Sequence, residues 1–229
     1  MKTFGIIGLG KMGGGLALQA LKKKFHVMGF DITAPNPELK KVGLYLAQNL
    51  ETFKKLPKPR AIFLYVPAGT EVDVILHNLS GILDKGDIII DGGNSYWEDS
   101  IKRAQLLKEK GLHFIDCGTS GGPEGALKGA CFMIGGESEP IKKIMPILTE
   151  LAAPEGIVIT GASGSGHFVK LIHNGIEFGM QQAIEEGIDL LSRFNQSLDI
   201  QKILHAWNHG SVIRSWLIEL MAKKHSENK

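Results

Sequence analysis

Short apolar runs alternate with longer amphipathic segments over the first 160 residues of the chain. Continuous runs rich in Val, Ile and Phe are typical of buried parallel strands, whereas apolar residues spaced by three or four positions indicate helices. The predicted strands are 3–8, 26–30, 61–66, 87–91, 113–117, 131–135 and 156–160. The predicted helices are 12–23, 70–83, 98–110 and 140–151. This alternation predicts an α/β fold with a Rossmann-type, doubly wound and mostly parallel sheet.

The pattern changes after residue 160, where no further strand is predicted. A glycine-rich loop at 161–166 precedes a long helix at 166–194 and two further helices at 197–206 and 211–224. The last of these carries an apolar stripe around Trp216, which needs a partner surface. The sequence therefore predicts two domains, 1–163 and 164–229, and a homodimer or higher homo-oligomer formed through the helical segment.

Composition restricts the classes of function. Apolar residues make up 43% of the 229 residues, which suffices for a buried core, and the net charge of +2 gives no reason to expect a nucleic acid or membrane partner. Cys117 and Cys131 alone form neither a disulfide scaffold nor a metal site, so no metal is expected. No apolar run approaches the roughly 20 residues that cross a bilayer, and we expect a cytoplasmic protein.

A Gly-x-Gly-x-x-Gly motif follows the first predicted strand and leads into the first predicted helix. Its residues are Gly8, Leu9, Gly10, Lys11, Met12 and Gly13. In this context the glycines admit a pyrophosphate to backbone N–H groups at a helix N-terminus. Asp31 ends the second strand and is predicted to bind the adenosine ribose hydroxyls, which favours NAD over NADP. A tight turn without a ligand is the alternative.

Other polar residues follow the carboxyl ends of later strands, where open α/β sheets bind ligands. The candidates for contact with cofactor or substrate are Val66, Pro67, Asn94, Ser120, Gly121 and Gly122. Asn94 is placed to touch either the nicotinamide or the substrate. Isolated turns of this composition are common, so their shared position at strand ends carries the prediction.

Four polar residues share one face of the long helix, because Lys170, His173, Asn174 and Glu177 are offset by 0, 3, 4 and 7 positions. An amine, an imidazole, an amide and a carboxylate in one volume supply a proton acceptor, hydrogen-bonding groups and a proton donor. A solvated helix face is the alternative. The apolar residues on another face are predicted to pack on a core; they are Val169, Ile172, Ile176, Ala183 and Ile184.

These segments, in this order, resemble the 6-phosphogluconate dehydrogenase family of the β-hydroxyacid dehydrogenase superfamily. The segments that carry the resemblance are 8–13, 91–95, 120–122, 167–177 and 207–215, so it covers essentially the whole chain. Asp31 and the short spacing to Arg214 are similar to the shorter, NAD-preferring branch. Phe178 stands where the family usually has tyrosine, and the chain stops before the remaining helical domain, so we expect a truncated member.

The resemblance implies oxidative decarboxylation of a small anionic sugar-acid phosphate, 6-phosphogluconate, to ribulose 5-phosphate. It implies that Lys170 is the base and Glu177 the acid. It also implies that His173, Asn174, Asn94 and residues 120–122 hold the carboxylate and hydroxyls, and that Arg214 meets the phosphate. A β-hydroxyacid dehydrogenase for another small hydroxy acid, or a catalytically impaired NAD-binding protein, is the alternative.

Overall fold

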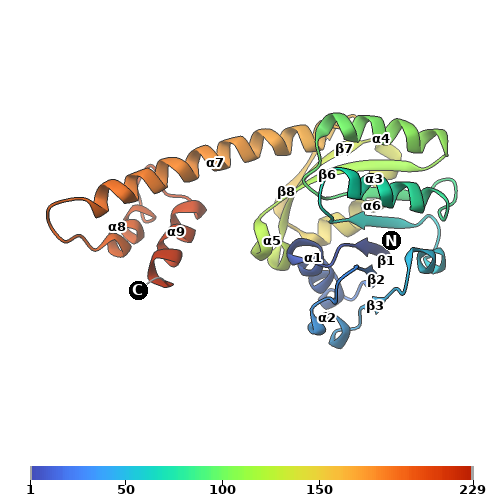
Figure 1. Ribbon diagram of the computed structural model, residues 1–229, viewed down its shortest axis with the longest axis horizontal. Helices are drawn as coiled ribbons and strands as arrows, with labels where there is room; N and C mark the ends of the chain where they lie inside the picture. Colours follow the sequence, from blue (N-terminus) through green and yellow to red (C-terminus); the bar gives the residue numbers. More distant parts are fainter. Residues whose placement is uncertain (1, 228–229) are drawn as a thin grey trace. The chain divides into compact units, whose positions relative to one another are not determined.

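The computed structural model describes residues 2–227 and divides the chain into two compact units, Met1–Leu171 and Ile172–Lys229. The boundary falls inside one continuous helix, α7 (Ser165–Ser192), which is therefore shared by the two units (Figure 1). The first unit contains the sheet and its covering helices, and the second contains helices alone.

An eight-stranded sheet forms the centre of the first unit, in the order β3-β2-β1-β4-β5-β6-β7-β8. All neighbouring strands are parallel except β6 and β7, which pair antiparallel. The strands are β1 (Thr3–Ile7), β2 (His26–Phe30), β3 (Tyr45–Leu46), β4 (Ala61–Leu64), β5 (Ile88–Asp91), β6 (His113–Ser120), β7 (Ala130–Gly136) and β8 (Ala152–Gly161). The chain order reverses between β1 and β4, as in doubly wound folds.

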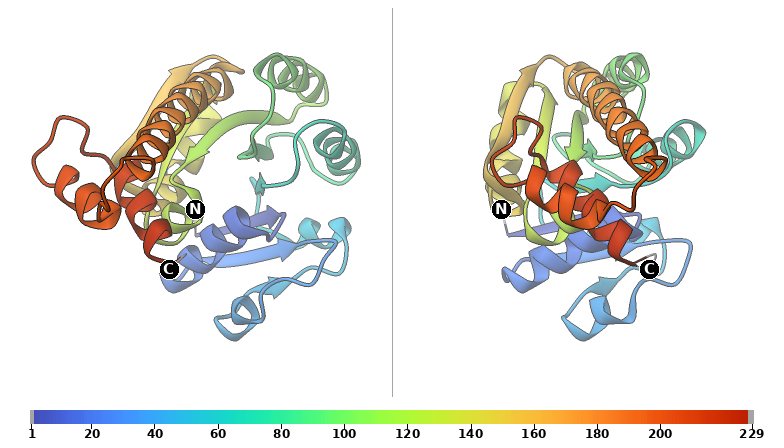
Figure 2. Two further views of the ribbon diagram at one scale, coloured as in Figure 1. Left: turned by 60° about the vertical axis from the view of Figure 1, so that its left-hand side comes forward. Right: turned by 90° about the vertical axis from the view of Figure 1, so that its left-hand side faces the viewer.

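Helices cover both faces of this sheet (Figure 2). Successive strand residues point to opposite faces: Ala61 and Phe63 join one hydrophobic cluster, and Ile62 and Leu64 join the other. The first cluster includes residues of α1 (Lys11–Lys22), α2 (Pro37–Lys41), α5 (Gly122–Lys128) and α6 (Ser138–Leu151). The second includes residues of the 3₁₀ helix η1 (Leu50–Lys55), α3 (Thr70–Ser80) and α4 (Trp97–Glu109).

The predicted α/β fold is confirmed, and the predicted strands are all present, β2 with the predicted ends and the others with ends shifted by one to four residues. Strand β6 continues to Ser120 rather than ending at Cys117, and β8 begins at Ala152. The sequence analysis missed the short elements α2, β3, η1 and α5. These elements have between two and seven residues, too few for a helical or strand period to show in the sequence.

The second unit contains the rest of α7 with α8 (Ile200–Trp207) and α9 (Trp216–Glu227). Ile200, Leu204 and Ile218 form its buried core, against which Ile184 packs. The predicted packing is wrong for Val169, Ile172, Ile176 and Ala183, which are all exposed, Ile172 by 51% and Ile176 by 60%. Trp216 is also exposed, and homo-oligomerisation through this segment stays a prediction.

An ion-pair cluster at the amino ends of β4 and β5 joins buried Arg60 and Asp87 to exposed Lys58 and Asp84. Arg60 Nη1 lies 2.7 Å from Asp87 Oδ2 and 2.6 Å from Asp84 Oδ2, and Lys58 Nζ lies 2.7 Å from the same Asp84 oxygen. Hydrogen bonds from Lys58 and from Arg60 lower the pKa of Asp84 from 3.8 to about 2. The charged form of Asp84 is therefore stabilised by folding.

This shift predicts how the contribution of Asp84 to stability depends on pH. Because its folded pKa is depressed, the contribution is fully present above the unfolded value of 3.8 and is lost as the pH falls towards about 2. We expect the wild type to be more stable than Asp84→Asn above pH 3.8, with the difference shrinking between pH 3.8 and 2. Urea unfolding of both proteins at several pH values measures this difference in the free energy of unfolding. A difference that stays constant down to pH 2 would contradict the lowered pKa of Asp84.

Candidate active site

A cavity of about 620 Å³ opens at the carboxyl ends of β1, β2 and β4, where the strand order reverses. Gly8, Gly10, Asp31, Val66 and Pro67 line it, so five of the predicted cofactor residues are brought together there. The rest of the lining is largely apolar; it includes Ile7, Phe30, Ile32, Tyr65, Val74 and Ile75. An apolar cleft with a carboxylate at its edge suits the adenosine half of a dinucleotide.

The glycine loop allows a ligand to approach the backbone closely. Gly8 has a φ of +90°, and a Cβ at this position would overlap the carbonyl oxygen of Tyr65. Gly10 precedes the first residue of α1, and a Cβ placed there would meet no atom within 4 Å. The loop thus leaves open space at a helix N-terminus, where the helix dipole favours a phosphate. The residues present fit a dinucleotide.

Asp31 is held in place by the glycine loop itself. Its Oδ2 accepts the N–H of Leu9 at 2.6 Å, and its Oδ1 accepts the N–H and the hydroxyl of Thr33, both at 2.8 Å. Partial burial acts to raise the pKa of Asp31, but these hydrogen bonds outweigh it and lower the pKa below its usual value. An ionised carboxylate therefore stands at the edge of the cleft.

The loop after β5 surrounds a second cavity of about 350 Å³, lined by residues that include Asn94, Ser95, Trp97 and His167. Asp91, the last residue of β5, fixes this loop: its Oδ1 accepts the N–H of Gly93 at 3.0 Å and its Oδ2 accepts the hydroxyl of Ser95 at 2.7 Å. The two anchors flank Asn94, which is exposed.

The N-terminus of α7 is fixed by a buried carboxylate on β6. Asp116 is fully buried, and its oxygens accept the N–H of Gly164 at 2.6 Å and of His167 at 3.0 Å. These N–H groups belong to the start of the helix, where backbone donors have no partner within the helix and negative charge is stabilised. His167 adds a second attachment, because its Nδ1 lies 2.7 Å from the hydroxyl oxygen of Ser100 on α4.

This attachment places Lys170 one helical turn further along, directly over β6. Lys170 is 9% exposed, and a Cβ at Gly118 would lie 2.5 Å from the Lys170 Cβ. The close approach requires glycine at 118, because any larger residue would push the helix away from the sheet. Lys170 is thus a largely buried amine at the carboxyl half of a strand that neighbours β5 and its Asn94 loop.

His173, Asn174 and Glu177 continue along α7 on the helix face of Lys170, by the repeat of the helix. The Nδ1 of His173 lies 3.5 Å from Glu177 Oε2 and 3.3 Å from Asn174 Oδ1. All three side chains are partly exposed, so they are open to solvent while Lys170 is not.

Ser120, Gly121 and Gly122 do not form the loop that the sequence analysis expected. Ser120 is the last residue of β6, Gly121 has a φ of +111°, and Gly122 is the first residue of α5. The turn from strand to helix is therefore immediate. Thr119, just before it, hydrogen-bonds the hydroxyl of Tyr65 at 3.1 Å, which ties this turn to the end of β4.

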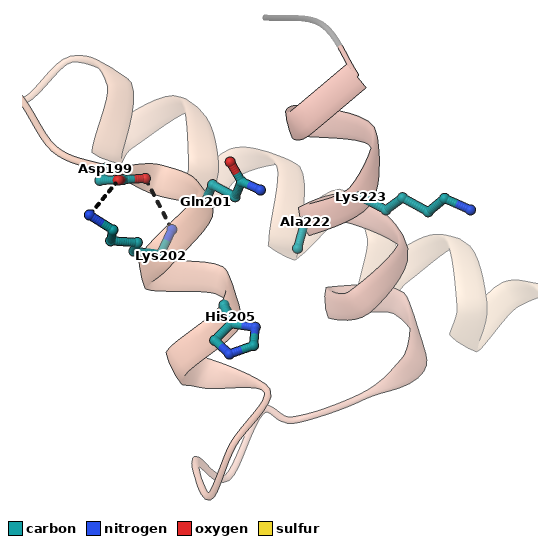
Figure 3. A pocket seen from close by; sticks show the side chains of 6 residues that line it. All are labelled: Asp199, Gln201, Lys202, His205, Ala222 and Lys223. Carbon is teal, nitrogen blue, oxygen red and sulfur yellow. Dashed lines mark hydrogen bonds and ion pairs between the residues drawn. The ribbon is translucent and has the colours of Figure 1, made fainter.

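Arg214 lies in the second unit, in the connection between α8 and α9, and is exposed. The same unit has a cavity of about 490 Å³ between these helices, in which Asp199 pairs with Lys202 at 3.3 Å (Figure 3). None of the predicted site residues lines this cavity. Within residues 2–227, no cluster of His, Cys, Asp and Glu could hold a metal ion, and no helix is long and apolar enough to cross a membrane.

The sequence analysis missed the residues that support the site. Asp116, Ser100 and Arg103 are buried polar groups of β6 and α4, and His167 was noted only as part of a motif. The available signal for Asp116 was a carboxylate inside an otherwise apolar strand, which is costly unless it has partners.

A glycine loop that opens a helix at a strand-order reversal, beside an apolar cleft with a carboxylate at its edge, is typical of dinucleotide-binding oxidoreductases. Residues 3–164 match the NAD binding domain of 6-phosphogluconate dehydrogenase, and residues 166–229 match the C-terminal domain of that enzyme. The chain belongs to the 6-phosphogluconate dehydrogenase family.

Relatives of known sequence agree with this membership. The chain is 46% identical over 218 residues to the Bacillus subtilis protein YqeC, covering 94% of this chain and 73% of YqeC. It is 39% identical to the NAD(+)-dependent, decarboxylating 6-phosphogluconate dehydrogenase of Haloferax volcanii, covering 94% of this chain and 72% of the relative. The chain is 40% identical to the decarboxylating 6-phosphogluconate dehydrogenase of Escherichia coli, of which it covers 49%.

Solved structures show the same fold. The 6-phosphogluconate dehydrogenase of Plasmodium falciparum, studied with NADP+ and with 6-phosphogluconate, superposes with a TM-score of 0.87 at 34% identity. That alignment covers 96% of this chain and 50% of the other. The 3-hydroxyisobutyrate dehydrogenase of Mycobacterium tuberculosis has a TM-score of 0.77 at 23% identity over 95% of this chain and 73% of the other, and shares the fold.

The anchoring of α7 by Asp116 makes a prediction about stability. Asp116→Asn keeps the volume but replaces a charged acceptor with an amide whose NH₂ faces a backbone N–H. We expect a loss of about 2–4 kcal/mol in the free energy of unfolding. The control is Glu139→Gln, which removes the charge from a 75% exposed side chain paired with Lys142 and should cost less than about 0.5 kcal/mol. Denaturant unfolding compares them, and equal effects would rule out the anchor.

Proposed function

We propose that this chain catalyses the oxidative decarboxylation of 6-phosphogluconate to ribulose 5-phosphate and carbon dioxide, with NAD as the preferred oxidant. The observation that carries the proposal is Lys170, a largely buried amine held against Gly118 beside the strand that leads to Asn94. Two relatives at 39% and 40% identity are named for this decarboxylating reaction.

The dinucleotide is held by the residues of the larger cavity. Residues 8–13 bring backbone N–H groups to the pyrophosphate, Asp31 accepts hydrogen bonds from the adenosine ribose, and Val66 and Pro67 line the same cavity. The preference for NAD follows from charge, since an ionised Asp31 repels a 2′-phosphate and Ile32, Thr33 and Ala34 supply no cation. When bound, the nicotinamide supplies the hydride acceptor.

Substrate binding is assigned to polar residues of α7, of the Asn94 loop and of the start of α5. Asn94, His173 and Asn174 offer amide and imidazole groups to the substrate carboxylate and hydroxyls, and residues 120–122 offer backbone N–H groups at the start of α5. Arg214 is assigned to the phosphate, because a guanidinium can bind two phosphate oxygens at once. With Phe178 in place of a tyrosine, that phosphate receives one hydroxyl contact fewer.

The chemistry requires one base and one acid. Lys170, in its neutral form, accepts the proton of the hydroxyl on carbon 3 as the hydride leaves that carbon. The bond to the carboxylate then breaks, carbon dioxide departs, and the electron pair remains as an enediolate that the protonated Lys170 stabilises. Glu177 delivers a proton to the carbon that lost the carboxylate, which becomes carbon 1 of the product. For a lysine to act as a base near neutral pH, its charged form must be disfavoured, by desolvation or by a nearby positive charge.

A second candidate is oxidation of another small hydroxy acid without a phosphate. It is favoured by Phe178, which stands where the family usually has a tyrosine, so that a substrate phosphate would lack one hydroxyl contact. Turnover of a non-phosphorylated hydroxy acid, with none of 6-phosphogluconate, would select this candidate.

The role of Lys170 predicts a separation of binding from turnover. The purified chain should reduce NAD in the presence of 6-phosphogluconate, and Lys170→Ala should lower kcat by at least about 100-fold, the smallest usual contribution of general acid–base catalysis. NAD binding, measured by calorimetry, should be unchanged because Lys170 does not line the dinucleotide cavity.

Lys142→Ala serves as the control, because Lys142 is 67% exposed on α6 and pairs only with its helix neighbour Glu139 in the contacts of the described chain. It should retain wild-type turnover. Activity retained in Lys170→Ala would remove the proposed base, whereas an inactive wild type that binds NAD would refute the proposed substrate.

The role of Asp31 predicts a change in cofactor preference. Asp31→Ala removes the charge that repels a 2′-phosphate, so the ratio of kcat/KM for NAD to that for NADP should fall by about tenfold, corresponding to ~1.4 kcal/mol. Glu71→Ala is the matched control, because Glu71 lines the same cavity and none of the Asp31 hydrogen bonds involves it. A ratio unchanged in Asp31→Ala, or changed equally by both variants, would contradict the ribose assignment.

A further inference from the structure

Arg103, on α4, is a buried arginine whose guanidinium contacts the start of α3 and the last residue of β5. It is 4% exposed. Its Nε donates to Asp73 Oδ1 at 2.7 Å, and its Nη2 donates to the carbonyl oxygen of Gly69 at 3.1 Å. Its Nη1 lies 3.7 Å from Asp91 Oδ2. The first two contacts hold the loop that opens α3, and the third faces the carboxylate that organises the Asn94 loop.

The loop that opens α3 and the Asn94 loop border two cavities of the first unit. Val66, Pro67 and Thr70 line the dinucleotide cavity of about 620 Å³, whereas Gly69 lines the cavity of about 350 Å³ that contains Asn94. The loop between β4 and α3 therefore separates the cavities and contributes to both. Arg103 lines neither of them, so it can act on a ligand only through the backbone and carboxylates that it holds.

The chain provides a matched arginine at the opposite end of the sheet. Arg60 is 6% exposed, pairs with Asp84 and Asp87, and donates to the carbonyl oxygen of Lys54. Both arginines thus combine two carboxylates with one backbone carbonyl under nearly complete burial. Arg60 lies at the amino ends of the strands, away from the carboxyl ends where the cavities open, so its contacts stabilise the fold without touching either loop.

We propose that Arg103 is a positioning residue that couples the dinucleotide loop to the Asn94 loop, so that both take their binding geometry from one guanidinium. The planar guanidinium of arginine is required, because its N–H groups point in fixed directions towards Asp73, the Gly69 carbonyl oxygen and Asp91. A lysine ammonium is a single compact group and cannot contact all three at the same time. The part of this inference that concerns substrate rests on the proposed function of Asn94, whereas the coupling of the loops does not.

The test compares Arg103→Lys with Arg60→Lys by two readouts that need no turnover. The first is the Kd of ADP-ribose, measured by calorimetry, which reports the dinucleotide cavity. The second is acrylamide quenching of Trp97, which lines the Asn94 cavity and packs on Phe168 with ring centres 5.5 Å apart. Trp207→Phe and Trp216→Phe remove the other two of the three tryptophans, so that Trp97 alone is observed.

We expect Arg103→Lys to raise the Kd of ADP-ribose by about tenfold, as for the loss of one charge-assisted hydrogen bond, and to increase the quenching of Trp97. Arg60→Lys should leave both readouts at their wild-type values while lowering the urea midpoint. If Arg103→Lys does not fold, Asp73→Asn replaces it, because the Asp73 side chain is 60% exposed and its loss removes only the Nε contact.

The proposal is overturned if Arg103→Lys leaves either readout unchanged, or if Arg60→Lys moves both as far. These outcomes are independent of the substrate. A wild type that fails to oxidise 6-phosphogluconate refutes the proposed function, and the binding and quenching results still decide the role of Arg103.

Discussion

The placement of the candidate active site depends on one buried carboxylate. Asp116 is removed from water, which would be costly for an unpaired charge, and backbone N–H groups at the start of α7 satisfy it. These hydrogen bonds stabilise both the carboxylate and the helix, because a helix N-terminus has N–H donors without partners and a partial positive charge. The Asp116 carboxylate thus fixes the start of α7, and the position of the helix start places Lys170 over Gly118. Neither hydrogen bond of Asp116 involves the Lys170 side chain.

A second carboxylate repeats this arrangement on the neighbouring strand. Asp91 ends β5 as a fully buried side chain and organises the Asn94 loop through Gly93 and Ser95. In register, Asp91 and Asp116 are paired residues of adjacent strands. Two buried negative charges side by side need compensation, and it comes from Arg103 on one side and the start of α7 on the other. The carboxyl end of the sheet is thereby stabilised by polar contacts where ligands must enter, while the apolar core lies beneath it.

The parts of the molecule that are local in sequence could be predicted, and those that depend on distant contacts could not. The glycine motif at 8–13 and the Asp31 position follow from a strand, a turn and a helix that are adjacent in the chain. Asp116 and Gly164 are 48 residues apart, so no local pattern reveals their bond. The polar stripe of α7 was found by its period, but the period did not distinguish a buried Lys170 from a partly exposed Glu177. The same limit explains why Ile176 was wrongly assigned to a core.

The fold does not by itself determine the substrate. A 3-hydroxyisobutyrate dehydrogenase shares this architecture at 23% identity, although it is named for a different acid. The first unit matches an NAD binding domain, and a dinucleotide cofactor is common to dehydrogenases of many acids. Discrimination between acids must therefore come from groups that meet the substrate away from the hydride-accepting end. In the proposed function these groups are the residues that follow Lys170 along α7, together with Arg214, and they belong to the second unit rather than to the unit that contains the sheet.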